Sequence, residues 1–180
     1  MEDERETTLA VDEFALRPWR RTDAPALLAA CQDPEIARWV TIPQPYREAD
    51  ADAFIESSLA AWRDGTGAPF AIVDAATDQL LGAATRFGPD GHQATLGLWL
   101  VPQARGRGIG TRSIRALATW TFATTAALRL DVFIMVGNDA SERMVERAGF
   151  TREGVLRAWD LHHDGIPVDC VAYSRLRTDD

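Results

Sequence analysis

Lysine is absent from this chain, in which all 19 basic residues are arginines. Schiff-base enzymes need a lysine amine and phosphate-binding loops of the GxxxxGK type need a lysine ammonium, so both classes are excluded. Cysteine is nearly absent as well, with only Cys31 and Cys170. The two lie far apart without the spacing of a metal or redox motif, which favours buried thiols over a disulfide or a zinc site.

Long hydrophobic runs are also missing. No apolar run reaches the roughly 18 residues that a membrane span needs, and the acidic start MEDERETTLA lacks the apolar core of a secretory signal. We therefore expect a cytoplasmic protein without a membrane partner. The net charge of −8 lacks the electropositive footprint of nucleic-acid-binding proteins, so no nucleic-acid partner is expected. The same charge suits a cationic substrate, or serves solubility alone.

The 180 residues, 46% of them hydrophobic and 26% charged, have the composition of one globular domain with a substantial core. Residues 1–11 are polar and aperiodic, which predicts a loose N-terminal tail. Residues 12–178 contain no repeat, low-complexity tract or linker and are predicted to form a single domain.

Hydrophobic periodicity predicts the order of helices and strands in this domain. The expected elements are a strand over 14–19, helical segments from about Thr22 to Trp39 with a break near Pro34 and over 47–63, three antiparallel strands over 69–101, a helix over 111–126, a strand over 128–136, a helix over 139–147, and a terminal hairpin over 150–176 that turns at 163–167. This order describes an α/β fold of the α+β type, a mixed and mostly antiparallel sheet of about seven strands with helices on both faces.

A glycine-rich loop, VPQARGRGIGTRS, joins the third antiparallel strand to a helix. Glycines at 106, 108 and 110 let the main chain approach a ligand, and the N–H groups there gather at the positive end of a helix dipole. Arg105 and Arg107 add charge-assisted donors. The pattern predicts a cradle for the pyrophosphate of a nucleotide-like cofactor, although a flexible turn with solvated arginines would show the same letters.

The segment QARGRG, from Gln103 to Gly108, resembles the Gln/Arg-x-x-Gly-x-Gly/Ala signature of the GNAT superfamily of N-acetyltransferases. The flanking segments LGLWLVPQARGRGIGTRSIRAL and NDASERMVERAGFTREGVLR resemble its RimJ/RimL-like branch, in which residues matching Asn138, Ser141 and the pair Gly149–Phe150 are usual. The opening FALRPWRRTDAPAL fits the first strand and helix of that branch. The resemblance extends over residues 12–177.

This resemblance implies a GNAT fold, with a sheet splayed between its fourth and fifth strands and acetyl-CoA (coenzyme A) inserted in the splay. The glycine loop would hold the pyrophosphate, and the main chain of the fourth strand would pair with the pantetheine arm as it would with an added strand. The implied cofactor-binding residues are Trp99, Leu100, Val101, Arg105, Gly106, Arg107, Gly108, Ile109, Gly110, Thr111, Asn138 and Ser141. No metal is implied.

Acetyl transfer to a primary amine needs a neutral amine, a donor for the developing oxyanion and a proton for the departing thiolate. The family implies an N–H group near Leu100 as the oxyanion donor. Many members donate the proton from a tyrosine, but the matching residue is Val145, so we expect Ser141 to act one helical turn after Asn138. Asn138 is expected to bind the pantetheine or a water, or to cap the helix, or both.

The general base is where the chain departs from the branch, because Thr95 stands where a glutamate is usual. Either Asp160 or Asp169 on the terminal hairpin acts through a water, or the amine arrives neutral. We favour the second, because an α-amino group has a pKa of about 8. His162 and His163, adjacent on an expected strand, are predicted to point to opposite faces and therefore to share no metal.

The acceptor amine is not specified by any motif. Trp39 and Trp159 lie where the family builds the walls of its acceptor site. A protein N-terminus, such as that of a ribosomal protein, and a small polyamine-like or aminoglycoside-like amine both fit, and a homodimer is left open. The alternative is a module that binds coenzyme A without turnover, which the missing glutamate and tyrosine favour and the retained Asn138 and Ser141 oppose.

Overall fold

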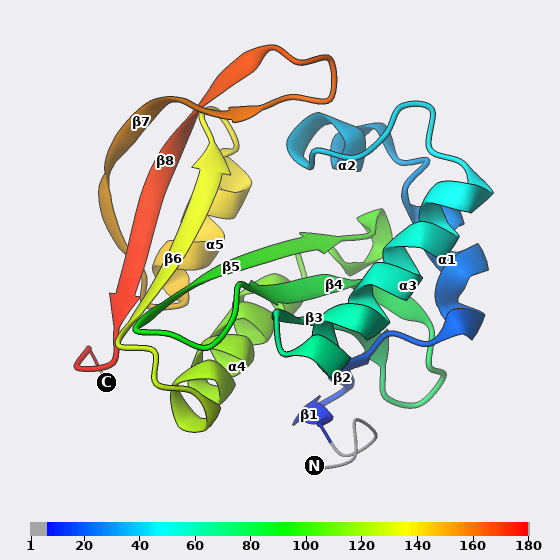
Figure 1. The fold of residues 1–180 in the computed structure, drawn as a ribbon, viewed down its shortest axis with the longest axis horizontal. Coiled ribbons are helices and arrows are strands. Elements are labelled where there is room, and N and C mark those ends of the chain that lie inside the picture. Colours follow the sequence, from blue (N-terminus) through cyan, green and yellow to red (C-terminus); the bar gives the residue numbers. More distant parts are fainter. Residues whose placement is uncertain (1–6, 180) are drawn as a thin grey trace.

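The fold is known from a computed structural model that describes residues 7–179 (Figure 1). The strands are β1 (Leu9–Val11), β2 (Phe14–Pro18), β3 (Gly67–Asp74), β4 (Leu80–Phe87), β5 (Gln93–Leu100), β6 (Arg129–Met135), β7 (Thr151–Leu161) and β8 (Pro167–Leu176). The helices are α1 (Ala24–Ala30), α2 (Pro34–Trp39), α3 (Glu48–Asp64), α4 (Ile109–Thr124) and α5 (Asp139–Arg147), with short 3-10 turns at Arg21–Asp23 and Pro102–Ala104.

The strands form one eight-stranded sheet in the order β1-β2-β3-β4-β5-β6-β8-β7. Every neighbouring pair is antiparallel except β5 and β6. The expected mixed and mostly antiparallel sheet is therefore confirmed. The expected number of strands is one too low, and the fourth and fifth expected strands are β5 and β6.

The additional strand is β1, in a segment for which the sequence predicts a loose tail. Leu9 pairs with Leu16 and Val11 with Phe14, and the side chains of Leu9 and Val11 pack against the core. A three-residue strand is too short to show a periodic pattern, so its place is decided by pairing with β2. Residues 1–6 of the predicted tail lie outside the described part of the chain.

The helices begin and end close to the expected positions, with one informative difference. Helix α5 spans the expected 139–147, and the break near Pro34 separates α1 from α2. Helix α4, however, begins at Ile109 rather than at Thr111. Gly108 precedes it with φ 72°, a left-handed conformation open to glycine, so the helix starts inside the glycine loop. The helix N-terminus thus belongs to the predicted cradle.

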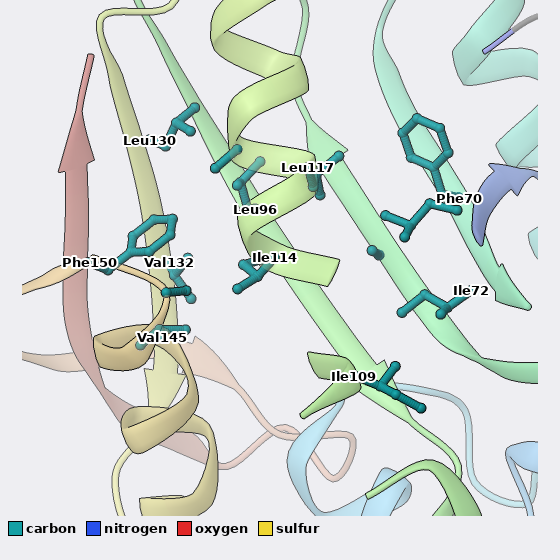
Figure 2. Close-up of a cluster of buried hydrophobic side chains, with 14 of the residues drawn as sticks. Phe70, Ile72, Leu96, Ile109, Ile114, Leu117, Leu130, Val132, Val145 and Phe150 are labelled. Carbon is teal, nitrogen blue, oxygen red and sulfur yellow. The ribbon is translucent and has the colours of Figure 1, made fainter. Parts of the chain in front are cut away.

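Two hydrophobic layers cover the sheet. On one face, α4 and α5 pack against alternate residues of the central strands; Figure 2 shows Ile114 of α4 pointing toward Val132 of β6 and Val145 of α5. On the other face, α1 and α3 cover a smaller cluster that includes Leu27, Ile55 and Ala83. The predicted helices on both faces are therefore confirmed.

The predicted splay lies between β5 and β6. These strands pair only through Gln93–Arg129, Ala94–Leu130 and Thr95–Asp131. Beyond those three pairs β5 stays with β4 and β6 stays with β8, so the two strands diverge toward their C-terminal ends (Figure 1). The expected splay is therefore confirmed.

Cys31 and Cys170 are both buried and free, as predicted. In the part of the chain that the structure describes, no helix has the length and apolar character needed to cross a membrane. Over the same residues, no group of three histidine, cysteine or acidic side chains is close enough to hold a metal ion.

An ion network ties β6 to β7 across β8. Both guanidinium Nη atoms of Arg129 donate to the Glu153 carboxylate, at 2.8 and 2.6 Å, and the Ser174 hydroxyl donates to the same carboxylate at 2.6 Å. The hydrogen bonds from Arg129, then that from Ser174, lower the pKa of Glu153 from 4.5 to about 2. Because the side chain of Glu153 is 42% exposed, solvent screening keeps the stabilisation modest.

We predict that Glu153 contributes to acid unfolding. A lowered pKa in the folded state stabilises the fold above pH 4.5, and this contribution is lost as the pH falls from 4.5 to about 2. Glu153→Gln should therefore be less stable than the wild type near pH 6 and lose less stability over that interval. Urea unfolding midpoints measured from pH 6 to pH 2 test this, with Asp52→Asn, an exposed residue of α3, as the control. Parallel curves for wild type and Glu153→Gln would contradict it.

Candidate active site

The splay opens into a cleft with a volume of about 1240 Å³. Residues 97–100 of β5 and 132–135 of β6 line its arms. We call the lining residues of the glycine loop, α4 and α5 the cofactor half, and the lining residues of α2, α3 and β7 the acceptor half. The cleft therefore reaches both layers of the molecule, and two substrates can approach one point from different sides.

The arm formed by β5 exposes unpaired main-chain groups. The Val101 N–H donates to the Leu81 carbonyl on β4 (3.0 Å), and hydrogen bonds in an antiparallel ladder alternate along a strand. Trp99 therefore also directs its main-chain groups to β4, while those of Leu98 and Leu100 face the splay. The Leu100 carbonyl accepts from the Arg105 guanidinium, so the groups that an inserted chain can pair with are those of Leu98 and the N–H of Leu100.

Val101, for which a main-chain role toward the cofactor is predicted, directs its N–H away from the splay. Its N–H is held by β4, its carbonyl accepts from the Ala104 N–H (3.0 Å), and the residue does not line the cleft. Leu98, which the sequence analysis does not include, lines the cleft and directs its main-chain groups to the splay through strand alternation. The N–H group of Leu100, which the family resemblance implies as the oxyanion donor, faces the splay. Trp99 lines the cleft through its position on β5, and its side chain packs against both hydrophobic clusters.

The glycine loop lines the cleft through Gly106 and Gly108. Gly106 and Gly108 both have φ 72°, and a Cβ added to either would meet no described atom within 4 Å. The helical bond from the Arg112 N–H to the Gly108 carbonyl (3.1 Å) leaves the N–H groups of the first turn of α4 without helical partners. Backbone donors and the positive end of the helix dipole therefore face open space, which is the arrangement that binds phosphate oxygens.

Gly110 serves packing rather than loop conformation. It lies in the first turn of α4, where an added Cβ would be 2.5 Å from the Met144 sulfur on α5. The glycine thus lets α5 approach the start of α4 closely. Ile109, Gly110 and Thr111 all line the cleft, as expected for residues that hold the cofactor.

The two loop arginines do not point into the cradle together. Arg105 lines the cleft, but its guanidinium donates to the Leu100 carbonyl (2.9 Å) and pairs with Asp33, the N-cap residue of α2. It connects β5 to α2 instead of reaching a phosphate. Arg107 is exposed and outside the cleft lining. Its charge acts instead on Glu13, whose pKa is lowered to about 2 mainly by a hydrogen bond with Arg112 and to a smaller extent by Arg107.

Asn138 and Ser141 lie together at the cleft, where α5 begins. The Asn138 side-chain oxygen accepts from the Ser141 N–H (3.2 Å), so Asn138 is the N-cap of the helix. This capping role was one of the two expected for it. The cap fixes the first turn of α5, and with it the position of the Ser141 side chain. Both residues line the cleft beside Met144.

Only some of the residues considered for proton transfer line the cleft. Thr95 does not line the cleft, and Val145 is buried in the core, where its position on α5 only contributes an apolar wall. Asp160 lines the acceptor half, with one carboxylate oxygen accepting from the Leu161 N–H (2.8 Å). Asp169 does not line it, and its carboxylate accepts from the Ala158 N–H (2.8 Å) within the hairpin. Of the two aspartates, Asp160 is the one the cleft contains.

Of the two tryptophan candidates only Trp39 lines the cleft, and the two histidines lie in the turn of the terminal hairpin. Trp39 lines the acceptor half, and its indole N–H donates to Glu35 (3.1 Å). Trp159 lies outside the lining and packs on Phe133, which does line it, with ring centroids 4.7 Å apart. The prediction that His162 and His163 point to opposite faces is wrong, because β7 ends at Leu161 and the two rings lie 3.9 Å apart in the turn.

Several lining residues carry no sequence signal of their own. Glu35 and Asp50 add carboxylates to the acceptor half, and Arg143 and Arg147 add cations to the cofactor half. Tyr46 is buried at the cleft, and burial first, then the nearby Cys31, raises the pKa of its hydroxyl, which stays protonated. Only the i, i+4 spacing of the two arginines could have indicated a shared face.

Coenzyme A fits this site. The unpaired edge of β5 can pair with the amides of a pantetheine arm, since a buried strand edge needs hydrogen-bond partners. The cradle at Gly106 and Gly108 has room for a pyrophosphate that side chains there would fill. The residues that would hold the group are Leu98, Leu100, the loop glycines, the first turn of α4 and the start of α5.

Comparison with known proteins agrees with this geometry. Residues 13–151 match the family described as "Acetyltransferase (GNAT) domain". Uncharacterized N-acetyltransferase YoaA of Bacillus subtilis is 24% identical over 94% of this chain and 96% of its own length. The structure of RimL, the ribosomal L7/L12 alpha-N-protein acetyltransferase, in complex with coenzyme A has a TM-score of 0.85 at 20% identity, covering 96% of this chain and 99% of that one.

The ribosomal-protein-S5-alanine acetyltransferase of Vibrio fischeri also has a TM-score of 0.85, at 16% identity, covering 97% of this chain and 98% of its own. At such identities the structural likeness establishes the fold, while the family match rests on the sequence itself. Since that match extends over more than half of the chain, this chain belongs to the GNAT family of acetyltransferases, as an N-acetyltransferase whose acyl donor is acetyl-CoA.

Proposed function

We propose that the chain acetylates a primary amine by direct attack within a ternary complex, with a protein N-terminus as the favoured acceptor and a small amine as the other. The observation that carries this is the two-sided cleft, in which a cofactor cradle and a carboxylate-lined entrance converge at the free edge of β5. The RimL and S5-alanine acetyltransferase structures, whose names state ribosomal-protein acceptors, support a protein acceptor. Action in the cytoplasm is part of the same proposal.

The charges of the lining support a positively charged acceptor. Its acidic residues, Glu35, Asp50 and Asp160, all lie in the acceptor half. Carboxylates at the mouth of a cleft raise the local concentration of cations, including amines that are protonated in bulk solution. The net charge of −8 acts in the same direction at longer range.

The residues of the chain then take the following roles. Bound acetyl-CoA supplies a thioester with an activated acyl carbon. The Leu100 N–H donates to the carbonyl oxygen, where negative charge develops as the amine attacks. Ser141 would supply a proton to the departing sulfur and be reprotonated by the proton that the attacking nitrogen loses, and Asn138 holds Ser141 in place through the N-cap hydrogen bond.

Deprotonation of the amine needs no residue of the chain in this proposal. An α-amino group with a pKa of about 8 is partly neutral at physiological pH, so the amine is deprotonated by solvent before attack. Asp160 attracts the acceptor and does not remove its proton.

The cradle predicts a binding defect for Gly108→Val. A β-branched residue at φ 72° is strained, and its side chain would fill the space that the pyrophosphate needs. Calorimetric titration with coenzyme A should detect no binding. Gly65→Val is the matched control, because Gly65 has φ 67°, equally open surroundings and a place outside the cleft. Normal binding by Gly108→Val would contradict the cradle.

Ser141→Ala should lower kcat by about a hundredfold, the usual contribution of general acid catalysis, without changing the affinity for coenzyme A. The Asn138 cap bonds the main chain of residue 141, so the variant keeps it. Ser141→Thr retains the hydroxyl and should recover most of the activity. Release of free thiol in the presence of acceptor measures all three proteins. Full activity of Ser141→Ala would show that another group donates the proton.

Asp160→Asn should raise the KM for a cationic acceptor about fivefold, since an exposed charge interaction contributes about 1 kcal/mol, and leave kcat nearly unchanged. The kcat/KM of both proteins should rise with pH up to about 8, where the amine loses its proton. Asp164→Asn, at the hairpin tip and outside the cleft lining, is the control. A lower kcat with loss of the pH dependence in Asp160→Asn would instead identify Asp160 as the base.

A panel of free and N-blocked peptides and small amines tests the acceptor class. Thiol release should require a free amine and be fastest with basic N-terminal peptides. Tight binding of coenzyme A with no acceptor-dependent release across the panel would overturn the proposal in favour of a non-catalytic module.

A further inference from the structure

Helix α2 carries two of the side chains that line the acceptor half, Glu35 and Trp39. The Trp39 indole N–H donates to a Glu35 carboxylate oxygen (3.1 Å), so the two side chains hold each other in place. The helix has six residues, all of them described by the structure, and among these only Ile36 is buried. Isolated helices of this length are unstable in water, so contacts with the rest of the protein decide where α2 lies.

One of these contacts comes from the glycine loop. One oxygen of the Asp33 carboxylate accepts from the Glu35 N–H (3.2 Å) and caps α2, and the other accepts from the Arg105 guanidinium. The same guanidinium donates to the Leu100 carbonyl through Nε (3.1 Å) and Nη2 (2.9 Å). Arg105 therefore joins the start of α2 to the free edge of β5, although Asp33 lies 72 residues away along the chain.

The ion pair is shielded on the side of its carboxylate. The side chain of Asp33 is 13% exposed and that of Arg105 is 38% exposed. A charge-assisted hydrogen bond to a largely buried carboxylate is stronger than one on the open surface, and a carboxylate that lost this partner would keep an uncompensated charge. The contact therefore restrains the start of α2.

We propose that Arg105 is a positioning residue for the acceptor. Through Asp33 it holds α2, and with it the side chains of Glu35 and Trp39, in place beside the free edge of β5. This rests on the proposed function, which assigns the lining residues of α2 to the acceptor. The Arg105 guanidinium already donates to two protein groups, so a residue of the cofactor loop acts on acceptor binding and not on the phosphates.

The test is a double-variant cycle of Arg105→Gln and Asp33→Asn, in which thiol release gives the KM for a basic N-terminal peptide. Asparagine caps helices as well as aspartate does, so Asp33→Asn removes the ion pair and keeps the cap. Each single variant should raise the acceptor KM about fivefold with kcat nearly unchanged. The double variant should also raise it about fivefold, and not about 25-fold, because both changes remove the same contact.

The direction of the two single effects separates positioning from charge alone. A cationic acceptor is attracted more strongly when a nearby arginine is neutralised and less strongly when an aspartate is neutralised. Charge alone would therefore lower KM in Arg105→Gln and raise it in Asp33→Asn, whereas positioning raises KM in both. Arg21→Gln is the matched control, because it breaks an exposed ion pair with Glu56 on α3 outside the cleft lining, and it should keep the wild-type KM.

Calorimetric titration with coenzyme A should give the wild-type affinity for all the variants, and thermal unfolding should show that they remain folded. Weaker binding of coenzyme A by Arg105→Gln with an unchanged acceptor KM would make Arg105 a ligand of the cofactor and overturn the inference. Additive effects in the double variant, or a lower KM in Arg105→Gln, would also overturn it. If the wild type binds coenzyme A but releases no thiol with any acceptor, the proposed function itself fails, and this inference fails with it.

Discussion

The short parallel pairing between β5 and β6 is the constraint on which the rest of the structure depends. Three residue pairs join the strands at one end, and beyond them each strand is held by its antiparallel neighbour. Ile114 of α4 packs together with Val132 of β6 and Val145 of α5 in the buried cluster on one face of the sheet (Figure 2). The main-chain groups of a buried strand edge need hydrogen-bond partners, and in the splay a bound ligand can supply these partners.

The same divergence organises the electrostatics. The start of α4, the glycine loop and the arginines of α5 bring positive potential to one half of the cleft, while Glu35, Asp50 and Asp160 bring negative potential to the other. In the proposed reaction, an anionic cofactor and a cationic acceptor would therefore be attracted to different entrances, and both entrances lead to the free edge of β5.

Local features were predictable because their causes are local. The bounds of α5 follow from an N-cap asparagine and a closing glycine, and the cradle follows from glycines placed where a strand meets a helix. Features that depend on hydrogen-bond direction were not predictable. Val101 and Leu98 look alike in sequence, and only the ladder with β4 decides which of them faces the splay. The rings of His162 and His163 meet because a strand ends one residue before them.

The sequence by itself determined the class of fold and the place of the glycine loop, because spacing, turn residues and periodicity act over a few neighbouring residues. The kind of cofactor followed from the resemblance of its motifs to those of the GNAT family. Only the tertiary structure decided which main-chain groups stay unpaired, that Arg105 is drawn to Asp33 and away from the cradle, and that Asp160 but not Asp169 reaches the cleft. These outcomes depend on contacts between segments that are far apart in the chain. There, several acceptors compete for the same donor, and the local sequence does not show which acceptor the donor binds.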